Sequence, residues 1–128
     1  MKFLAPAVTT ILLLASGSAA LACKCAVSSR EAAAKQSQFV FDGRVLRVRT
    51  DNEAHYAIIE MLRPIKGAIP GTLEVATPQS SASCGYDFRK GQLLTVGVNL
   101  REQQFWTSSC VMQALNPGNS ESRKRDGK

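Results

Sequence analysis

The chain changes character within the segment Ala20-Leu21-Ala22-Cys23-Lys24-Cys25, where an apolar leader ends and a Cys-x-Cys pair begins. Lys2 gives the leader a positive start, and the stretch from Val8 to Ala15 is mostly apolar but too short to span a bilayer. Two alanines before the first cysteine fit the small-x-small rule for signal peptidase. We therefore expect residues 1–22 to be a signal peptide, and Cys23 to be the first residue of the mature chain.

A lipoprotein signal would also place a cysteine directly after the cleavage site. Such signals normally have a large aliphatic residue three positions before that cysteine, and this chain has Ala20 there. We favour simple secretion, and lipidation of Cys23 stays open as the alternative that would attach the protein to a membrane. The expected location is secreted or extracytoplasmic, and periplasmic if the host is bacterial.

The four cysteines are the main constraint on the mature chain. In an exported domain of this size they predict two disulfides, because an oxidising compartment lets disulfides persist and small cores benefit from them. A zinc knuckle or a redox pair is disfavoured, since the chain has no Cys-x-x-Cys and His55 is its only histidine. We expect one domain over residues 23–115, followed by a disordered basic tail over residues 116–128.

Alternating apolar residues predict a mainly β domain. The expected strands are Phe39–Arg49, Ala54–Leu62, Thr72–Thr77, Leu94–Leu100 and Gln104–Met112. The apolar face of the first strand changes partway, and Gly43 near that change predicts a bulge or bend. Ser28 and Glu31 form a capping box that predicts a short helix before the first strand. The pattern is typical of a small closed antiparallel barrel with one or two short helices.

The spacing of the cysteines reduces the possible disulfide pairings from three to two but does not choose between these two. Four cysteines allow three pairings, and a bond between Cys23 and Cys25 would close a strained small ring. Both residues are therefore expected to reach Cys84 and Cys110, in either of two crossing patterns.

The sequence contains no recognisable catalytic or cofactor motif. We find no nucleophile with a base, no paired carboxylates in a known motif and no phosphate-binding loop, so we expect neither an enzyme nor a cofactor. His55 is interpreted as a surface or edge residue, and Phe105 and Trp106 as core and rim.

The formal net charge of +6 is moderate, and part of it lies in Arg123-Lys124-Arg125. Aromatic residues do not interleave with the basic ones, which argues against nucleic acid as a partner. A polyanionic glycan remains an alternative partner, with these candidate residues: Arg44, Arg47, Arg49, Arg63 and Lys66.

Several motifs together resemble the N-terminal inhibitory domain of the tissue inhibitors of metalloproteinases, the TIMP family. They follow the Cys-x-Cys pair in this order: Phe41-Asp42-Gly43, Ile65-Lys66-Gly67, Thr77-Pro78, Ser83-Cys84-Gly85-Tyr86 and Thr107-Ser108-Ser109-Cys110. The resemblance covers nearly all of residues 23–115. It implies a netrin-like, OB-like barrel stapled by disulfides that join Cys23 to Cys84 and Cys25 to Cys110.

The resemblance also implies a function and a site. An inhibitory ridge would consist of Cys23, Lys24, Cys25 and Ala26 beside the loop Ser80, Ser81, Ala82 and Ser83. The partner would be a zinc metalloprotease, whose catalytic zinc keeps one position open for water. The α-amine and carbonyl oxygen of Cys23 can bind that zinc as a five-membered chelate and displace the water.

Two departures from the family pattern limit this interpretation. The family has a small residue after the first cysteine, where this chain has Lys24, whose ammonium is costly to bury in an apolar pocket. The family's third disulfide is missing, with Lys35 about where its first cysteine would fall, and we expect no second cysteine-rich domain. The alternative is a non-inhibitory netrin-like module, stapled by disulfides, that binds a protein or a polyanionic glycan.

Overall fold

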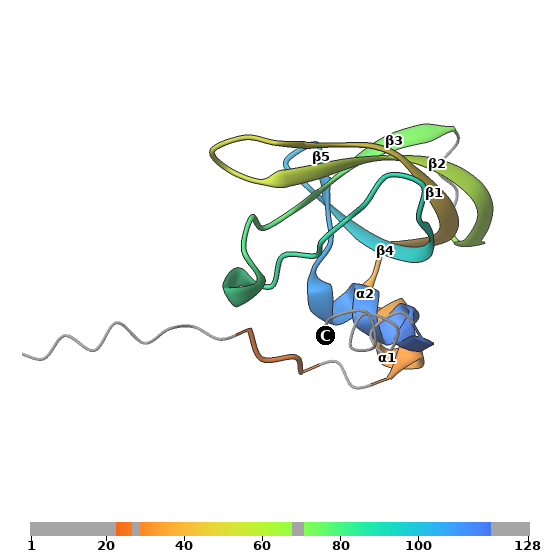
Figure 1. The fold of residues 1–128 in the computed structure, drawn as a ribbon. Helices are drawn as coiled ribbons and strands as arrows, with labels where there is room; N and C mark the ends of the chain where they lie inside the picture. The colour runs from red at the N-terminus through yellow and green to blue at the C-terminus, as the bar shows by residue number, and fades with distance from the viewer. Residues whose placement is uncertain (1–22, 27–28, 68–70, 119–128) are drawn as a thin grey trace, which may run out of the picture.

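The computed structural model describes residues 23–26, 29–67 and 71–118 (Figure 1). The expected signal peptide and residues 119–128 of the expected tail lie outside the described residues. The elements follow this order: α1 (Arg30–Gln36), β1 (Phe39–Thr50), β2 (His55–Lys66), β3 (Thr72–Thr77), the 3-10 helix η1 (Ser81–Ser83), β4 (Leu93–Arg101), β5 (Gln104–Trp106) and α2 (Ser109–Leu115).

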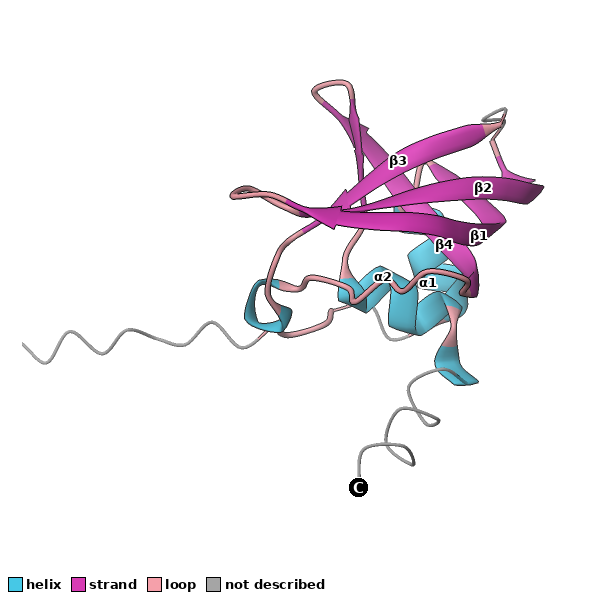
Figure 2. Ribbon diagram, turned by 45° about the horizontal axis from the view of Figure 1, so that its top comes forward, coloured by secondary structure: helices cyan, strands magenta, loops and turns pink. Residues whose placement is uncertain are grey.

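The five strands close into a barrel in the order β1-β2-β3-β5-β4, with β4 pairing back onto β1. All neighbouring strands are antiparallel except β3 and β5, which are parallel. Both helices lie beside the barrel on the same side (Figures 1 and 2). The expected mainly β fold, a small closed OB-like barrel with two short helices and two disulfides, is confirmed.

Strand β1 bends so that it can pair with β2 along its length and with β4 at its start. Its pairing with β2 has three register shifts, and Gly43 lies at one of them, as the sequence predicts. A Cβ at Gly43 would lie 2.6 Å from Cγ2 of Ile59, so a larger residue would push the two strands apart. Another register shift lies between Val45 and Arg47, where the apolar residues of β1 change from one face of the strand to the other. Beyond this shift, Val48 is exposed.

The barrel interior is a continuous apolar core. Leu94, Val96 and Val98 of β4 all point into it, which confirms the alternation seen in the sequence. From the other strands and the segments after β3 and β5, the buried members are Phe41, Val45, Ala57, Ile59, Leu73, Val75, Tyr86, Phe88 and Met112. Burial of these side chains is the main source of stability for such a barrel.

The N-cap of α1 is Ser29, one residue later than the predicted cap at Ser28. Ser29 has extended backbone angles, and its Oγ accepts a hydrogen bond of 3.1 Å from the backbone N–H of Ala32. At the other end of the helix, Nζ of Lys66 donates to the carbonyl oxygens of Ala34 and Ser37 at 2.9 and 2.6 Å. Lys66 thus satisfies carbonyl groups that a helix terminus leaves without partners.

The prediction of one strand over Gln104–Met112 is wrong in its second half. Strand β5 ends at Trp106, and α2 begins at Ser109. The Oγ of Ser108 caps this helix by accepting from the backbone N–H of Val111 at 3.3 Å. A helix also turns Met112 and Leu115 toward the protein interior, where both are buried.

Asn116 follows the last residue of α2 as its C-cap. Its side chain exchanges hydrogen bonds of 2.8 and 2.7 Å with the backbone of Thr95, and it also donates to the carbonyl of Met112. The end of α2 is therefore fixed to β4.

We predict that glycine at the β4–β5 turn stabilises the fold. Glu102 and Gln103 form this two-residue turn with φ of 51° and 68°, the left-handed region that favours glycine. Glu102→Gly should raise the free energy of unfolding by about 0.5 to 1 kcal/mol. The matched change Glu53→Gly, at an exposed loop residue without positive φ, should lower it. Equal effects in denaturant titrations would contradict the prediction.

Candidate functional site

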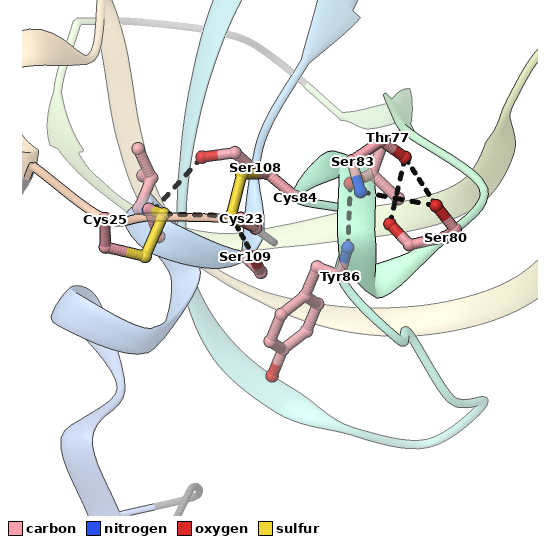
Figure 3. The surroundings of a disulfide bond; sticks show 11 residues. Cys23, Cys25, Thr77, Ser80, Ser83, Cys84, Tyr86, Ser108 and Ser109 are labelled. Carbon is pink, nitrogen blue, oxygen red and sulfur yellow. Dashed lines mark hydrogen bonds between the residues drawn. A yellow bond between two sulfur atoms is a disulfide. The ribbon is translucent and has the colours of Figure 1, made fainter. Parts of the chain in front are cut away.

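Two disulfides fix the N-terminal segment of the described chain. They join Cys23 to Cys84 and Cys25 to Cys110, with Cα–Cα distances of 5.0 and 5.2 Å. This is the pairing that the resemblance implies, and it resolves the choice that cysteine spacing leaves open. The segment that contains Cys23 is thereby held against both the loop after β3 and the start of α2 (Figure 3).

The loop Ser80–Ser83 is a compact hydrogen-bonded turn. Ser80 caps η1, and its Oγ lies 2.7 Å from Oγ of Ser83 and 3.3 Å from the backbone N–H of the same residue. The backbone N–H of Gly85 donates to the carbonyl of Ser80 at 2.8 Å, and Cys84 adopts φ of 68° between them. The chain therefore doubles back at the residue that bonds to Cys23.

Contacts on three sides hold this loop in place. The backbone N–H of Tyr86 donates to Oγ1 of the fully buried Thr77 at 2.9 Å, and the Tyr86 ring packs edge-on against Phe88 in the core. The backbone N–H of Ser109 donates to the carbonyl of Cys84 at 2.8 Å. A Cβ at Gly85 would overlap the carbonyl oxygens of Pro78 and Ser80, so only glycine fits there.

The predicted ridge residues are accessible. Lys24, Cys25 and Ala26 are exposed, as are all residues of the loop Ser80–Ser83, whereas Cys23 and Cys84 are half-buried. The Cys23–Cys84 bond brings the first residue of the expected mature chain to the end of the loop. A cleft of about 370 Å³ opens beside this junction, and three of the predicted residues line it: Cys23, Cys25 and Ser81.

The same cleft contains residues that the sequence did not single out as a site. They are His55, Gln79, Gly85, Tyr86, Asp87, Ser109 and Gln113. His55 is half-buried, with Nδ1 2.6 Å from Oγ1 of Thr50, and its Nε2 has no hydrogen-bond partner among the described residues. These residues come from β2, two loops and α2, so no sequence motif could have grouped them.

The β1–β2 turn is tied to the rim of this cleft. Nε2 of Gln79 donates to the backbone carbonyl of Asp51. Backbone N–H groups of Ala54 and Glu53 donate to the Asp51 carboxylate and lower its pKa. Because this pKa is depressed in the folded state, Asp51 stabilises the turn above its unfolded pKa, and that contribution is lost as the pH falls.

The arginines of β1 and β2 do not form a surface of free cations. Arg49 pairs with Glu74 at 3.0 Å, and this hydrogen bond raises its pKa. Arg63 pairs with Asp42 at 2.8 Å, and the Nζ of Lys66 is occupied by backbone carbonyls. Of the five candidate residues for polyanion binding, only Arg44 and Arg47 have neither an ion pair nor a side-chain hydrogen bond among the described residues.

The disulfides indicate an oxidising, extracytoplasmic location, because such bonds rarely persist in the cytosol. In the described part of the chain, no helix combines the length and apolar character needed to cross a membrane.

We predict that the hydroxyl of Thr77 holds the loop that contains Cys84. Thr77→Val keeps the side-chain shape but removes the acceptor for the Tyr86 N–H, and it should lower the free energy of unfolding by about 1 to 3 kcal/mol. Thr77→Ser keeps the hydroxyl and should retain more of the stability. Denaturant unfolding of both variants tests this, and a loss in Thr77→Val no larger than the loss in Thr77→Ser would contradict a dominant role for the hydroxyl.

Comparison with known proteins gives no identity for the chain. No family model matches it, and no curated protein matches its sequence. Its function must therefore be argued from the geometry of the site.

Proposed function

We propose that the protein is a secreted inhibitor of zinc metalloproteases that binds the catalytic zinc through Cys23. The observation that carries this proposal is the bond between Cys23 and Cys84, which fixes an exposed N-terminal segment beside an ordered loop. The proposal requires cleavage after Ala22, so that the α-amino group of Cys23 becomes free. Secretion by a signal peptide is part of the same proposal.

The chemistry needs only backbone atoms of one residue. The amine nitrogen and carbonyl oxygen of an N-terminal Cys23 close a five-membered ring with the zinc of the protease. An α-amino group has a pKa of about 7.7 to 8.0, so a useful fraction is neutral near physiological pH. The chelate occupies the position that holds the attacking water in a catalytic zinc site, and inhibition follows without a covalent step.

A rigid protein should bind the protease zinc more tightly than a free dipeptide that offers the same amine and carbonyl groups. Both cysteines of the Cys-x-Cys pair are bonded to the folded domain, and the loop Ser80–Ser83 is held by its own hydrogen bonds. Ordering these segments in the free protein lowers the entropy that binding would otherwise cost. The exposed residues 24–26 and the exposed loop Ser80–Ser83, which meet at Cys23, then provide contact area for the protease.

Lys24 sets a limit on which proteases can be bound. It lies between the two anchored cysteines with its side chain exposed. Burying its ammonium in an apolar specificity pocket would cost several kcal/mol unless the pocket supplies a partner. Within this proposal, proteases with apolar pockets should be poor targets.

The alternative is a non-inhibitory module that binds a protein or a polyanionic glycan. Ion pairs and backbone contacts occupy three of its five candidate cations, Arg49, Arg63 and Lys66. We therefore rank glycan binding below the inhibitor.

We predict that one extra alanine before Cys23 abolishes inhibition. The extension converts the Cys23 amine into an amide, a far poorer zinc ligand, and leaves both disulfides in place. Inhibition constants against a panel of zinc metalloproteases provide the measurement, with intact-mass analysis confirming the N-terminus. If the extended protein inhibits as well as the native one, chelation by the Cys23 amine is wrong.

We also predict that Lys24→Ser strengthens inhibition of proteases with apolar pockets. Removal of a buried unpaired ammonium is worth several kcal/mol, and each 1.4 kcal/mol corresponds to about tenfold in affinity. The matched control is Lys35→Ser on α1, a lysine outside the proposed ridge, which should leave the inhibition constant unchanged. Loss of inhibition in Lys24→Ser would mean that the lysine contributes to binding instead of limiting it.

A further inference from the structure

The two disulfides touch one another. Sγ of Cys23 lies 3.5 Å from Sγ of Cys110, which belongs to the other bridge. The Sγ atoms of Cys23, Cys84 and Cys110 all lie within 4.8 Å of one another. Because both sulfurs of the 3.5 Å contact are in disulfide bonds, neither carries a proton, and the contact is van der Waals. Figure 3 draws it as the dashed line between the two bridges.

The four cysteines differ in their accessibility. Cys25 is exposed, Cys23 and Cys84 are half-buried, and Cys110 is 9% exposed. Cys23 and Cys25 also line the cleft of about 370 Å³, which is open to small molecules. Cys25 is therefore the most exposed of the four cysteines and the favoured point of attack for a small thiol.

We propose that Cys25 is a modification site for low-molecular-weight thiols, and that exchange begun there passes through Cys110 to the Cys23–Cys84 bridge. In the first step the thiolate of the small molecule attacks Sγ of Cys25. A mixed disulfide forms on Cys25, the Cys25–Cys110 bond breaks, and Cys110 leaves as a thiolate. Thiolate attack on a disulfide sulfur is the general route of such exchange.

The second step uses the contact between the bridges. The Cys110 thiolate attacks Sγ of Cys23 at 3.5 Å, a Cys23–Cys110 bond forms, and Cys84 leaves as a thiolate. The Cys84 thiolate can then attack Cys25 and expel the small thiol, which gives a Cys25–Cys84 bond without net oxidation or reduction. If the small thiol stays on Cys25, Cys84 takes a proton, and the net change is addition of one thiol molecule.

This exchange would move the attachment point of the N-terminal segment. Cys23 would be bonded to α2 instead of to the loop after η1, so the geometry beside Ser80–Ser83 would change. The inference does not depend on metalloprotease inhibition, because it concerns the sulfur atoms alone. Its test measures disulfides and can fail or succeed whatever the protein inhibits.

The experiment follows the release of Cys84 in the mature, fully oxidised protein. Reduced glutathione is added at fixed pH, samples are quenched in acid, free thiols are alkylated, and peptides are mapped by mass spectrometry. The comparison variant is the double substitution Cys25→Ser with Cys110→Ser, which retains the Cys23–Cys84 bond but lacks the relaying thiolate. Alkylation of Cys84 should be at least about tenfold slower in this variant, because glutathione must then attack the half-buried Cys23–Cys84 bond directly, whereas in the native protein it attacks exposed Cys25 and a fast intramolecular step follows.

The relay and independent reaction of the two bridges predict opposite changes in the rate at which Cys84 is released in the variant that lacks Cys25 and Cys110. If each bridge reacts independently, removal of one bridge loosens the domain and Cys84 should be released as fast or faster in the double variant, which would overturn the proposal. The double variant Cys23→Ser with Cys84→Ser is the matched control, in which glutathione should still modify Cys25 at the native rate.

A second measurement on the native protein does not depend on the folding of either variant. Early time points should contain a peptide with Cys23 bonded to Cys110, together with glutathione on Cys25 or a Cys25–Cys84 peptide. Glutathione on Cys25 with free Cys110 and an intact Cys23–Cys84 bond throughout the time course would show that no relay occurs.

Discussion

The Cys-x-Cys pair at the start of the domain is the constraint on which the site depends. Its two bonds span 61 and 85 residues, and the chain-entropy model assigns each alone about 4 kcal/mol, although the two overlapping loops do not contribute independently. Without them, residues 23–26 would be a short extended segment with no strand or helix to hold it. The two bonds make this segment part of the domain and define where the expected mature chain begins relative to the loop Ser80–Ser83.

The barrel supplies the fixed points for these bonds. Cys84 follows a turn whose geometry depends on Thr77 at the end of β3 and on the absence of a side chain at Gly85. Cys110 is the second residue of α2, which is buried against the core and tied to β4 through Asn116. Barrel closure brings the end of β3 next to β5, and so brings the two distant cysteines together.

The sequence predicts the fold well because period-two patterns and turn residues are local signals. Leu94, Val96 and Val98, the bend at Gly43 and the helix after Ser29 could be recognised in this way, with an error of one residue at the cap. The segment after Trp106 was misassigned because Cys110 and Met112 also fit a strand of alternating residues, and only packing against the core decides for a helix. The cleft could not be predicted, since His55, Gln79 and Gln113 meet only after the barrel has closed.

The close packing that holds Cys23 in place also brings the two disulfides into contact with each other. Cysteines separated by a single residue must bond to partners that are themselves close in space, and Cys84 and Cys110 accordingly lie on touching segments joined by the Ser109 N–H bond to the Cys84 carbonyl. Four sulfurs confined in this way come into van der Waals contact, here at 3.5 Å. In this domain the Cys-x-Cys pair therefore brings the two disulfides close enough for the exchange proposed above, and exposed Cys25 offers external thiols a point of attack.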